Sequence, residues 1–162
     1  MRSDTSRAET PGRKLFIAGC ITLLLFSTVH MVPMFIDMFG EPTEPVEIEA
    51  RRAMASVVID MGPFHTHKGN LWLLLSASYS TLLFFVVALN FAALPAIVAH
   101  GRLRLFAAVN AIFVGVLLGI ALMYQFPPPG VFALIAVLFF IAAIVRARPS
   151  LATSSEQLLC DG

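Results

Sequence analysis

The segment LWLLLSASYSTLLFFVVALNFAALPAIVA, residues 71–99, contains no Asp, Glu, Lys or Arg. A helix of about 20 apolar residues crosses the hydrocarbon layer of a membrane, so this segment is long enough to span it with some tilt. Pro95 is expected to kink the helix or to end it. The segment therefore predicts a membrane-spanning helix rather than a strand or a soluble core helix.

Three further apolar segments accompany this one along the chain. Residues 15–36 precede it and residues 103–125 follow it, while residues 128–145 come after a proline-rich turn. The last segment is short, but proline is tolerated in the first turn of a helix, so the helix can begin within the turn. We therefore predict an all-α integral membrane protein whose residues 15–145 form a single bundle of four transmembrane helices.

The composition of the whole chain agrees with this class. Of its 162 residues, 58% are hydrophobic and 13% are charged, with a mean hydropathy of +0.84. Soluble domains carry about 25% charged residues. The net charge is +1 and no basic block is long enough to follow a phosphate backbone, which excludes nucleic acid as a partner. The expected partner is the lipid bilayer.

The distribution of basic residues predicts the orientation of the spans, because short cytoplasmic flanks are enriched in Lys and Arg. The outside loop, residues 37–70, carries three basic residues. Eight flank the spans on the other side: Arg2, Arg7, Arg13, Lys14, Arg102, Arg104, Arg146 and Arg148. We therefore expect a multi-pass protein of the plasma membrane (the inner membrane of a bacterium), with residues 1–14 and 146–162 as disordered cytoplasmic segments.

The outside loop is expected to contain an amphipathic helix over residues 46–61, where apolar residues recur at spacings of three and four. Glu47 and Arg51 are one turn apart and form an ion pair along the helix. Gly62 and Pro63 are expected to end it. Such a helix either lies in the membrane interface, closes over the mouth of the bundle, or simply connects two spans.

Polar residues inside the spans are the candidates for a ligand site, because they are costly in hydrocarbon and face a cavity or the bundle interior. Near the outer ends of the spans, with Trp72 as an interface anchor, they outline a patch: His30, Ser76, Tyr79, Ser80, Tyr124 and Gln125. We expect His30 and Tyr79 to face each other. The alternative is that His30 only forms a hydrogen bond that fixes helix register.

Two more patterns concern packing inside the membrane. Asn90 and Asn110 lie ten residues before and after His100, so they are expected at equal depth on antiparallel helices, where their amides can pair. Small residues recur every four positions along the third span: Ala107, Ala111, Gly115 and Gly119. This ridge predicts a close helix contact, although small residues are frequent in membrane helices in general.

No motif indicates a cofactor, and we expect none. A metal site is the sharpest alternative, since thioether and imidazole groups suit copper and the loop region offers His30, Met34, His65 and His67. Their spacing matches no closed site, so we expect no metal. Phosphate-binding loops, Cys-x-x-Cys pairs and catalytic triads are also missing from the sequence, which favours a non-enzymatic role.

The order of short motifs along the chain is a further feature. FSTVHM (residues 26–31) is followed by EARRAM (residues 49–54), then by Gly69, Trp72 and a serine-rich second span. In this layout the chain resembles small bacterial four-span membrane proteins of uncharacterised function. The resemblance implies a fold and no activity.

The sequence thus favours a small membrane protein that acts by association with a lipid, an apolar small molecule or a membrane protein partner. The alternative is a membrane-embedded small-molecule or redox enzyme or carrier that uses the patch around His30 and Tyr79. A protein that binds metal through Met and His is a third hypothesis.

Overall fold

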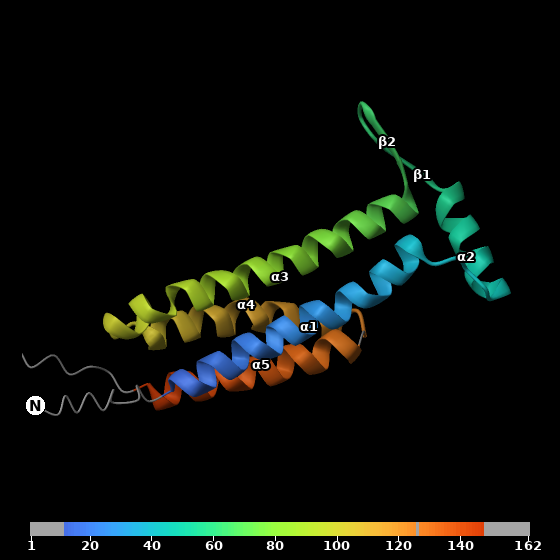
Figure 1. Ribbon diagram of the computed structural model, residues 1–162. Coiled ribbons are helices and arrows are strands. Elements are labelled where there is room, and N and C mark those ends of the chain that lie inside the picture. Colours follow the sequence, from blue (N-terminus) through green and yellow to red (C-terminus); the bar gives the residue numbers. More distant parts are fainter. Residues whose placement is uncertain (1–11, 126, 148–162) are drawn as a thin grey trace, which may run out of the picture. The chain divides into compact units, whose positions relative to one another are not determined.

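The computed structural model describes residues 12–125 and 127–147, and helices make up 83% of it. Four helices are long and apolar enough to cross a membrane (Figure 1): α1 (Arg13–Phe39), α3 (Lys68–Ala99), α4 (Leu103–Met123) and α5 (Pro127–Arg146). The predicted helical class is confirmed, and each of the four predicted apolar segments corresponds to one of these helices. Of the predicted disordered segments, residues 1–11 and 148–162 lie outside the described residues, while Arg13 and Lys14 already belong to α1.

The outward faces of these helices are apolar as well as their inward faces. In the most apolar 18-residue window of each helix, only 22–33% of the residues are buried within the protein. Exposing apolar surface to water costs about 25 cal/mol per Å². Helices with so much exposed apolar surface require lipid around them, which makes the chain a membrane protein by the length and composition of its helices.

The chain divides into two compact units, and α1 and α3 contribute residues to both. Unit 1 comprises Met1–Thr22 and Leu89–Gly162, and unit 2 comprises Leu23–Ala88. Unit 1 therefore contains α4, α5, the first turns of α1 and the last turns of α3. Unit 2 contains the remainder of α1 and α3 with the whole predicted outside loop.

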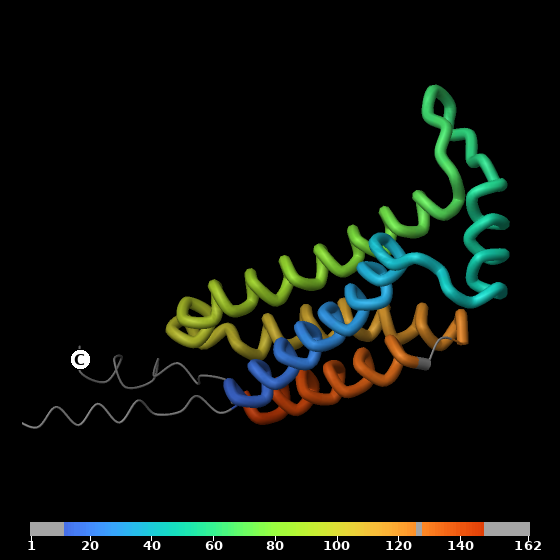
Figure 2. Tube along the Cα trace, turned by 45° about the vertical axis from the view of Figure 1, so that its right-hand side comes forward, coloured from blue at the N-terminus to red at the C-terminus, as the bar shows by residue number. Residues whose placement is uncertain are grey.

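In unit 1, α4 and α5 lie side by side (Figure 2). The residues that α4 buries recur at spacings of three, four and seven: Leu103, Ala107, Asn110, Val114 and Ala121. The first turns of α1 pack on α5, where the rings of Phe16 and Phe140 meet edge to face with centroids 5.6 Å apart. Gly19 lies against the same ring, since a Cβ there would be 2.7 Å from Phe140.

The small-residue ridge predicted on α4 makes no close contact at its two glycines with the described residues. A Cβ added at Gly115 or Gly119 would meet nothing within 4 Å, and only Ala107 of the four is fully buried. The physical reason is helical geometry. A step of four residues turns about 400°, so a strict repeat of four drifts by about 40° per step away from a straight contact. The buried residues of α4, at steps of four, three, four and seven, stay on the face of the helix that is in contact.

We predict that Gly19→Ala destabilises the protein whereas Gly115→Ala does not. The new methyl group at residue 19 would collide with Phe140, which is itself buried and held by Phe16. Overpacking of this kind lowers the free energy of unfolding by about 1–3 kcal/mol. At Gly115 the space is open, and alanine favours helix by up to about 1 kcal/mol. Thermal unfolding of both variants in the same detergent measures the difference.

In unit 2 the loop between the spans is only partly helical. It consists of α2 (Pro45–Ser56), β1 (Val58–Met61) and β2 (Phe64–His67), and the two strands pair antiparallel. The helix predicted over residues 46–61 therefore ends five residues early. Val57, Val58 and Ile59 form a run of β-branched residues, which favours strand over helix.

The predicted helix stop at Gly62 and Pro63 is instead the turn of this hairpin. Met61 pairs with Phe64, so the turn has two residues, and Gly62 has a φ of +65°. A glycine at positive φ in the first central position suits a two-residue hairpin turn. The chain thus reverses between residues 61 and 64, and the hairpin projects beyond the start of α3 (Figure 1).

Pro95 does not end the second span. Helix α3 continues past it for one turn and stops at Ala99. Proline removes one backbone hydrogen bond and crowds the preceding turn, but membrane helices tolerate it where neighbouring groups compensate. Pro33 is likewise accommodated inside α1.

Candidate ligand-binding site

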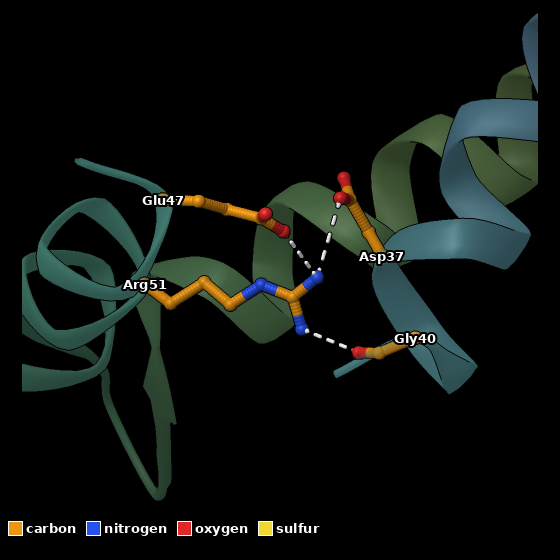
Figure 3. A network of polar contacts seen from close by, with 4 residues as sticks. All are labelled: Asp37, Gly40, Glu47 and Arg51. Carbon is orange, nitrogen blue, oxygen red and sulfur yellow. Dashed lines mark hydrogen bonds and ion pairs between the residues drawn. The ribbon is translucent and has the colours of Figure 1, made fainter. Parts of the chain in front are cut away.

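Arg51 of α2 forms the centre of a polar cluster in unit 2, shown in Figure 3. One guanidinium nitrogen, Nη2, donates to Glu47 Oε1 at 2.8 Å and lies 3.6 Å from Asp37 Oδ1, while Nη1 donates to the carbonyl oxygen of Gly40 at 3.2 Å. The Glu47 contact is the ion pair that the one-turn spacing predicts. The two other contacts reach the end of α1, so Arg51 fixes α2 against that end.

This cluster is partly open to solvent, which limits its energy. The side chains of Arg51, Asp37 and Glu47 retain 29%, 39% and 39% of their accessible surface. Ion pairs with this degree of exposure contribute at most about 1 kcal/mol each. The main effect of the cluster is therefore geometric: a planar guanidinium with two hydrogen-bond acceptors and a second carboxylate beside it sets the position of α2.

A cavity of about 290 Å³ opens beside the cluster. Its walls come from the end of α1, from α2, from the end of β2 and from the start of α3: Asp37, Glu47, Ala50, Arg51, Met54, Ala55, His67, Gly69, Asn70, Trp72 and Leu73. Gly69 at the start of α3 faces Met54 of α2, since a Cβ added at Gly69 would lie in ordinary van der Waals contact, 3.7 Å from the Cβ of Met54. The cavity exists because the hairpin returns the chain to α2.

The lining of this cavity has a definite chemical character. Ala50, Met54, Trp72 and Leu73 supply apolar and aromatic surface, and two carboxylates face a single guanidinium. With neutral histidine the walls carry one excess negative charge. Carboxylates and an indole face attract cations and disfavour anions. The cavity can therefore accept an apolar body whose polar end is uncharged or positive.

The sequence predicts part of this site. The Glu47 and Arg51 pair and the interface position of Trp72 follow from spacing, but the roles of Asp37, His67 and Asn70 do not. Those three residues come together only because residues 58–67 form a hairpin. A helix over residues 57–61, as predicted from sequence, leaves no such hairpin. The β-branched run at Val57 is the signal that could have revealed it.

The predicted patch inside the spans is divided between the units. In unit 2 the rings of His30 and Tyr79 meet edge to face at 5.6 Å, and Phe26 packs 6.2 Å and 6.1 Å from them. Ser27, on the same helix as His30, donates a hydrogen bond of 2.9 Å to the carbonyl oxygen of Ser80. The structure therefore places His30 opposite Tyr79, in an aromatic contact between α1 and α3.

The serines of the patch differ in their surroundings. Ser76 is half-buried, one turn before Ser80 on α3. Ser80 is fully buried, and its hydroxyl has no hydrogen-bond partner in the described part of the chain. Tyr124 and Gln125 belong to unit 1, follow the end of α4 and are exposed, with Gln125 at a φ of +50°. Unit 2 thus contains four of the six predicted patch residues.

Asn90 and Asn110 are hydrogen-bonded to each other in unit 1. The Asn90 amide nitrogen donates to Asn110 Oδ1 at 2.7 Å, and the Asn110 nitrogen donates to Asn90 Oδ1 at 3.1 Å and to the Phe106 carbonyl oxygen at 2.9 Å. Both side chains are buried. A carboxamide left unpaired in hydrocarbon is costly, so this reciprocal pair stabilises the α3–α4 contact.

The four residues weighed for a metal site lie in different surroundings. His65 pairs across the hairpin with Asp60 at 2.5 Å, His67 lines the cavity, Met34 is buried on α1 and His30 packs on Tyr79. Within residues 12–125 and 127–147 there is no group of three or more His, Cys, Asp or Glu side chains that could hold a metal ion.

Comparisons of the chain with protein-family models, with curated proteins and with solved structures gave no match.

We predict that Arg51→Ala loosens α2 and that Arg52→Ala does not. Removing Arg51 leaves Asp37, Glu47 and the Gly40 carbonyl without their shared donor, whereas the neighbouring Arg52 is exposed and makes no ion pair with any described residue. After discounting for exposure, the loss is about 1–2 kcal/mol. Hydrogen exchange of the α2 amides measures it. Equal exchange in the two variants would contradict the role given to Arg51.

Proposed function

We propose that the chain is a multi-pass membrane protein that binds an amphipathic molecule in the cavity of unit 2. The ligand has an apolar body and a polar end that is uncharged or cationic. The observation that carries the proposal is the cavity of about 290 Å³ between α2 and the start of α3, with apolar walls and one excess carboxylate.

Three features support this class of ligand. The cavity lies at the ends of α1 and α3, so a molecule partitioned into the lipid reaches it without crossing the bilayer. Trp72 offers a rigid aromatic surface at the same place. Arg51 fixes α2 in position before any ligand arrives, which reduces the entropy lost on binding.

The proposal includes an orientation. With eight basic residues on one side of the spans and three on the other, both termini belong in the cytoplasm and the cavity of unit 2 faces outward from the plasma membrane. The bound molecule would then come from the outer leaflet or from the outside medium.

Cysteine labelling tests the orientation. We expect Glu44→Cys and Lys68→Cys to react with a membrane-impermeant maleimide in intact cells, and Ser154→Cys to react only after the cells are opened. The native cysteines are replaced by serine in this background, because Cys20 and Cys160 would otherwise add their own signal. Labelling of Ser154→Cys alone in intact cells would reverse the proposed topology.

Ligand binding is measurable by fluorescence, because Trp72 is the single tryptophan of the chain and lines the cavity. The protein is placed in phosphatidylcholine nanodiscs and titrated with dodecyltrimethylammonium or with dodecyl sulfate, which share a chain length and differ in charge. We expect a saturable change of Trp72 emission with the cation and none with the anion.

Two alanines of α2 provide the matched variants. Ala55 lines the cavity, whereas Ala53 is exposed and does not. Ala55→Leu fills part of the space and should weaken the fluorescence response to dodecyltrimethylammonium by about tenfold, equivalent to about 1.4 kcal/mol. Ala53→Leu should leave it unchanged. The proposal fails if dodecyl sulfate binds equally well or if Ala55→Leu responds like the native chain.

The alternative enzyme or carrier function rests on the contact of His30 with Tyr79. It predicts that a ligand co-purified with the native protein is lost in Tyr79→Phe and retained in Ala55→Leu. The cavity proposal predicts the reverse pattern, so the same pair of variants separates the two functions.

A further inference from the structure

A second cavity, of about 310 Å³, lies at the turn that joins α3 to α4 in unit 1. Its walls are mainly apolar, with two nitrogen-bearing side chains among them: Ala93, Ala96, Ile97, His100, Arg102 and Phe106. None of these residues belongs to the cavity of unit 2. This second cavity therefore needs an explanation of its own.

The turn is built so that His100 and Arg102 are held in place. Gly101 has a φ of +64°, its N–H donates to the Val98 carbonyl oxygen, and the Arg102 N–H donates to that of Ile97. These two bonds form the helix-ending pattern in which a glycine in the left-handed region closes the last turn. The backbone at the mouth of the cavity is consequently fixed by the end of α3.

The histidine ring is fixed as well. Its Nδ1 lies 2.8 Å from the Ala96 carbonyl oxygen. A carbonyl only accepts hydrogen bonds, so in this contact Nδ1 carries the proton and donates. The ring therefore keeps Nε2 as its remaining polar atom, which accepts a hydrogen bond from an outside partner.

The charge that the described residues place at this cavity is positive. Arg102 is exposed, makes no ion pair with any described residue and provides no side-chain cap for α4, whose first turn contains no acidic residue. Arg104, two residues further on, is basic and exposed as well, and residues 89–125 contain no Asp or Glu. The start of α4 adds the positive end of a helix dipole. The second cavity therefore suits an anion.

We propose that this cavity binds an anionic glycerophospholipid of the surrounding bilayer. Its phosphate contacts Arg102 beside the first turn of α4, a hydroxyl of its headgroup donates to Nε2 of His100, and one acyl chain lies along Ala96, Ile97 and Phe106. An inorganic anion would need only the basic residues, whereas the apolar walls and the position at the ends of two spans fit a lipid. This site is independent of the proposed function, and its ligand has the opposite charge preference.

Native mass spectrometry of the full chain in a non-ionic detergent tests the proposal. Phosphatidylglycerol and phosphatidylcholine with identical acyl chains are added in equal amounts, and the retained lipid is counted. We expect phosphatidylglycerol to be retained preferentially. Arg102→Gln should weaken this retention by about tenfold, because a charge-assisted contact is lost. Arg52→Gln in unit 2, which removes the same charge elsewhere, should retain the lipid like the native chain.

A second pair of variants separates a lipid from a free anion. Ala96→Leu narrows the cavity, whereas Ala92→Leu lies one turn earlier, is exposed and does not line it. We expect only Ala96→Leu to lose phosphatidylglycerol, and millimolar inorganic phosphate not to displace it. Retention unaffected by both Arg102→Gln and Ala96→Leu, or complete displacement by inorganic phosphate, would overturn the proposal. Equal retention of the two lipids would do the same.

Discussion

Hydrocarbon offers no hydrogen-bond partner to a peptide group, and each unpaired group there costs several kcal/mol. In this protein that constraint makes every spanning segment a helix and restricts irregular backbone to the ends of the spans. The β-hairpin of residues 58–67, the turn at Gly101 and the link before α5 all lie between spanning helices. The two cavities at α2 and at the α3–α4 turn are found beside two of these irregular places, where side chains of mixed polarity can converge.

The same constraint explains how polar side chains are tolerated on the spans. Asn90 and Asn110 satisfy each other, Ser27 donates to a backbone carbonyl, and Thr22 donates to the carbonyl oxygen of Ala18. His30 and Tyr79 instead use their ring edges and faces against each other and against Phe26. Several of these polar groups therefore contribute to helix contacts, while Thr22 bonds within its own helix and the Ser80 hydroxyl has no hydrogen-bond partner in the described part of the chain. The ion-paired residues Arg51 and Asp37 lie where the spans end.

The features that follow from a single helix period were predictable from sequence, and those that depend on tertiary geometry were not. Apolar runs without charge predicted the four spanning helices. The equal sequence distances of Asn90 and Asn110 from His100 predicted that their side chains pair. The helix predicted over residues 46–61 failed because apolar residues at spacings of three and four also occur in a helix followed by a strand. The ridge through Gly115 stays a prediction, since a Cβ added there meets nothing within 4 Å and a repeat of four does not follow a straight contact. The cavity in unit 2 is lined by residues from four elements, and no local sequence pattern predicts that these elements meet.

The sequence separation of the polar contacts has a consequence for the order in which parts of the protein fold. The partners of Arg51 lie within 14 positions of it along the chain. Asn90 and Asn110 are 20 residues apart, and Ser27 and Ser80 are 53 residues apart. Contacts between near residues close small loops and cost little chain entropy, so they can form early. The short loops closed by Arg51 and by the two amides therefore favour early formation of the α2 contact and of the α3–α4 hairpin. The contact of Ser27 with Ser80 closes a longer loop and is expected to form later.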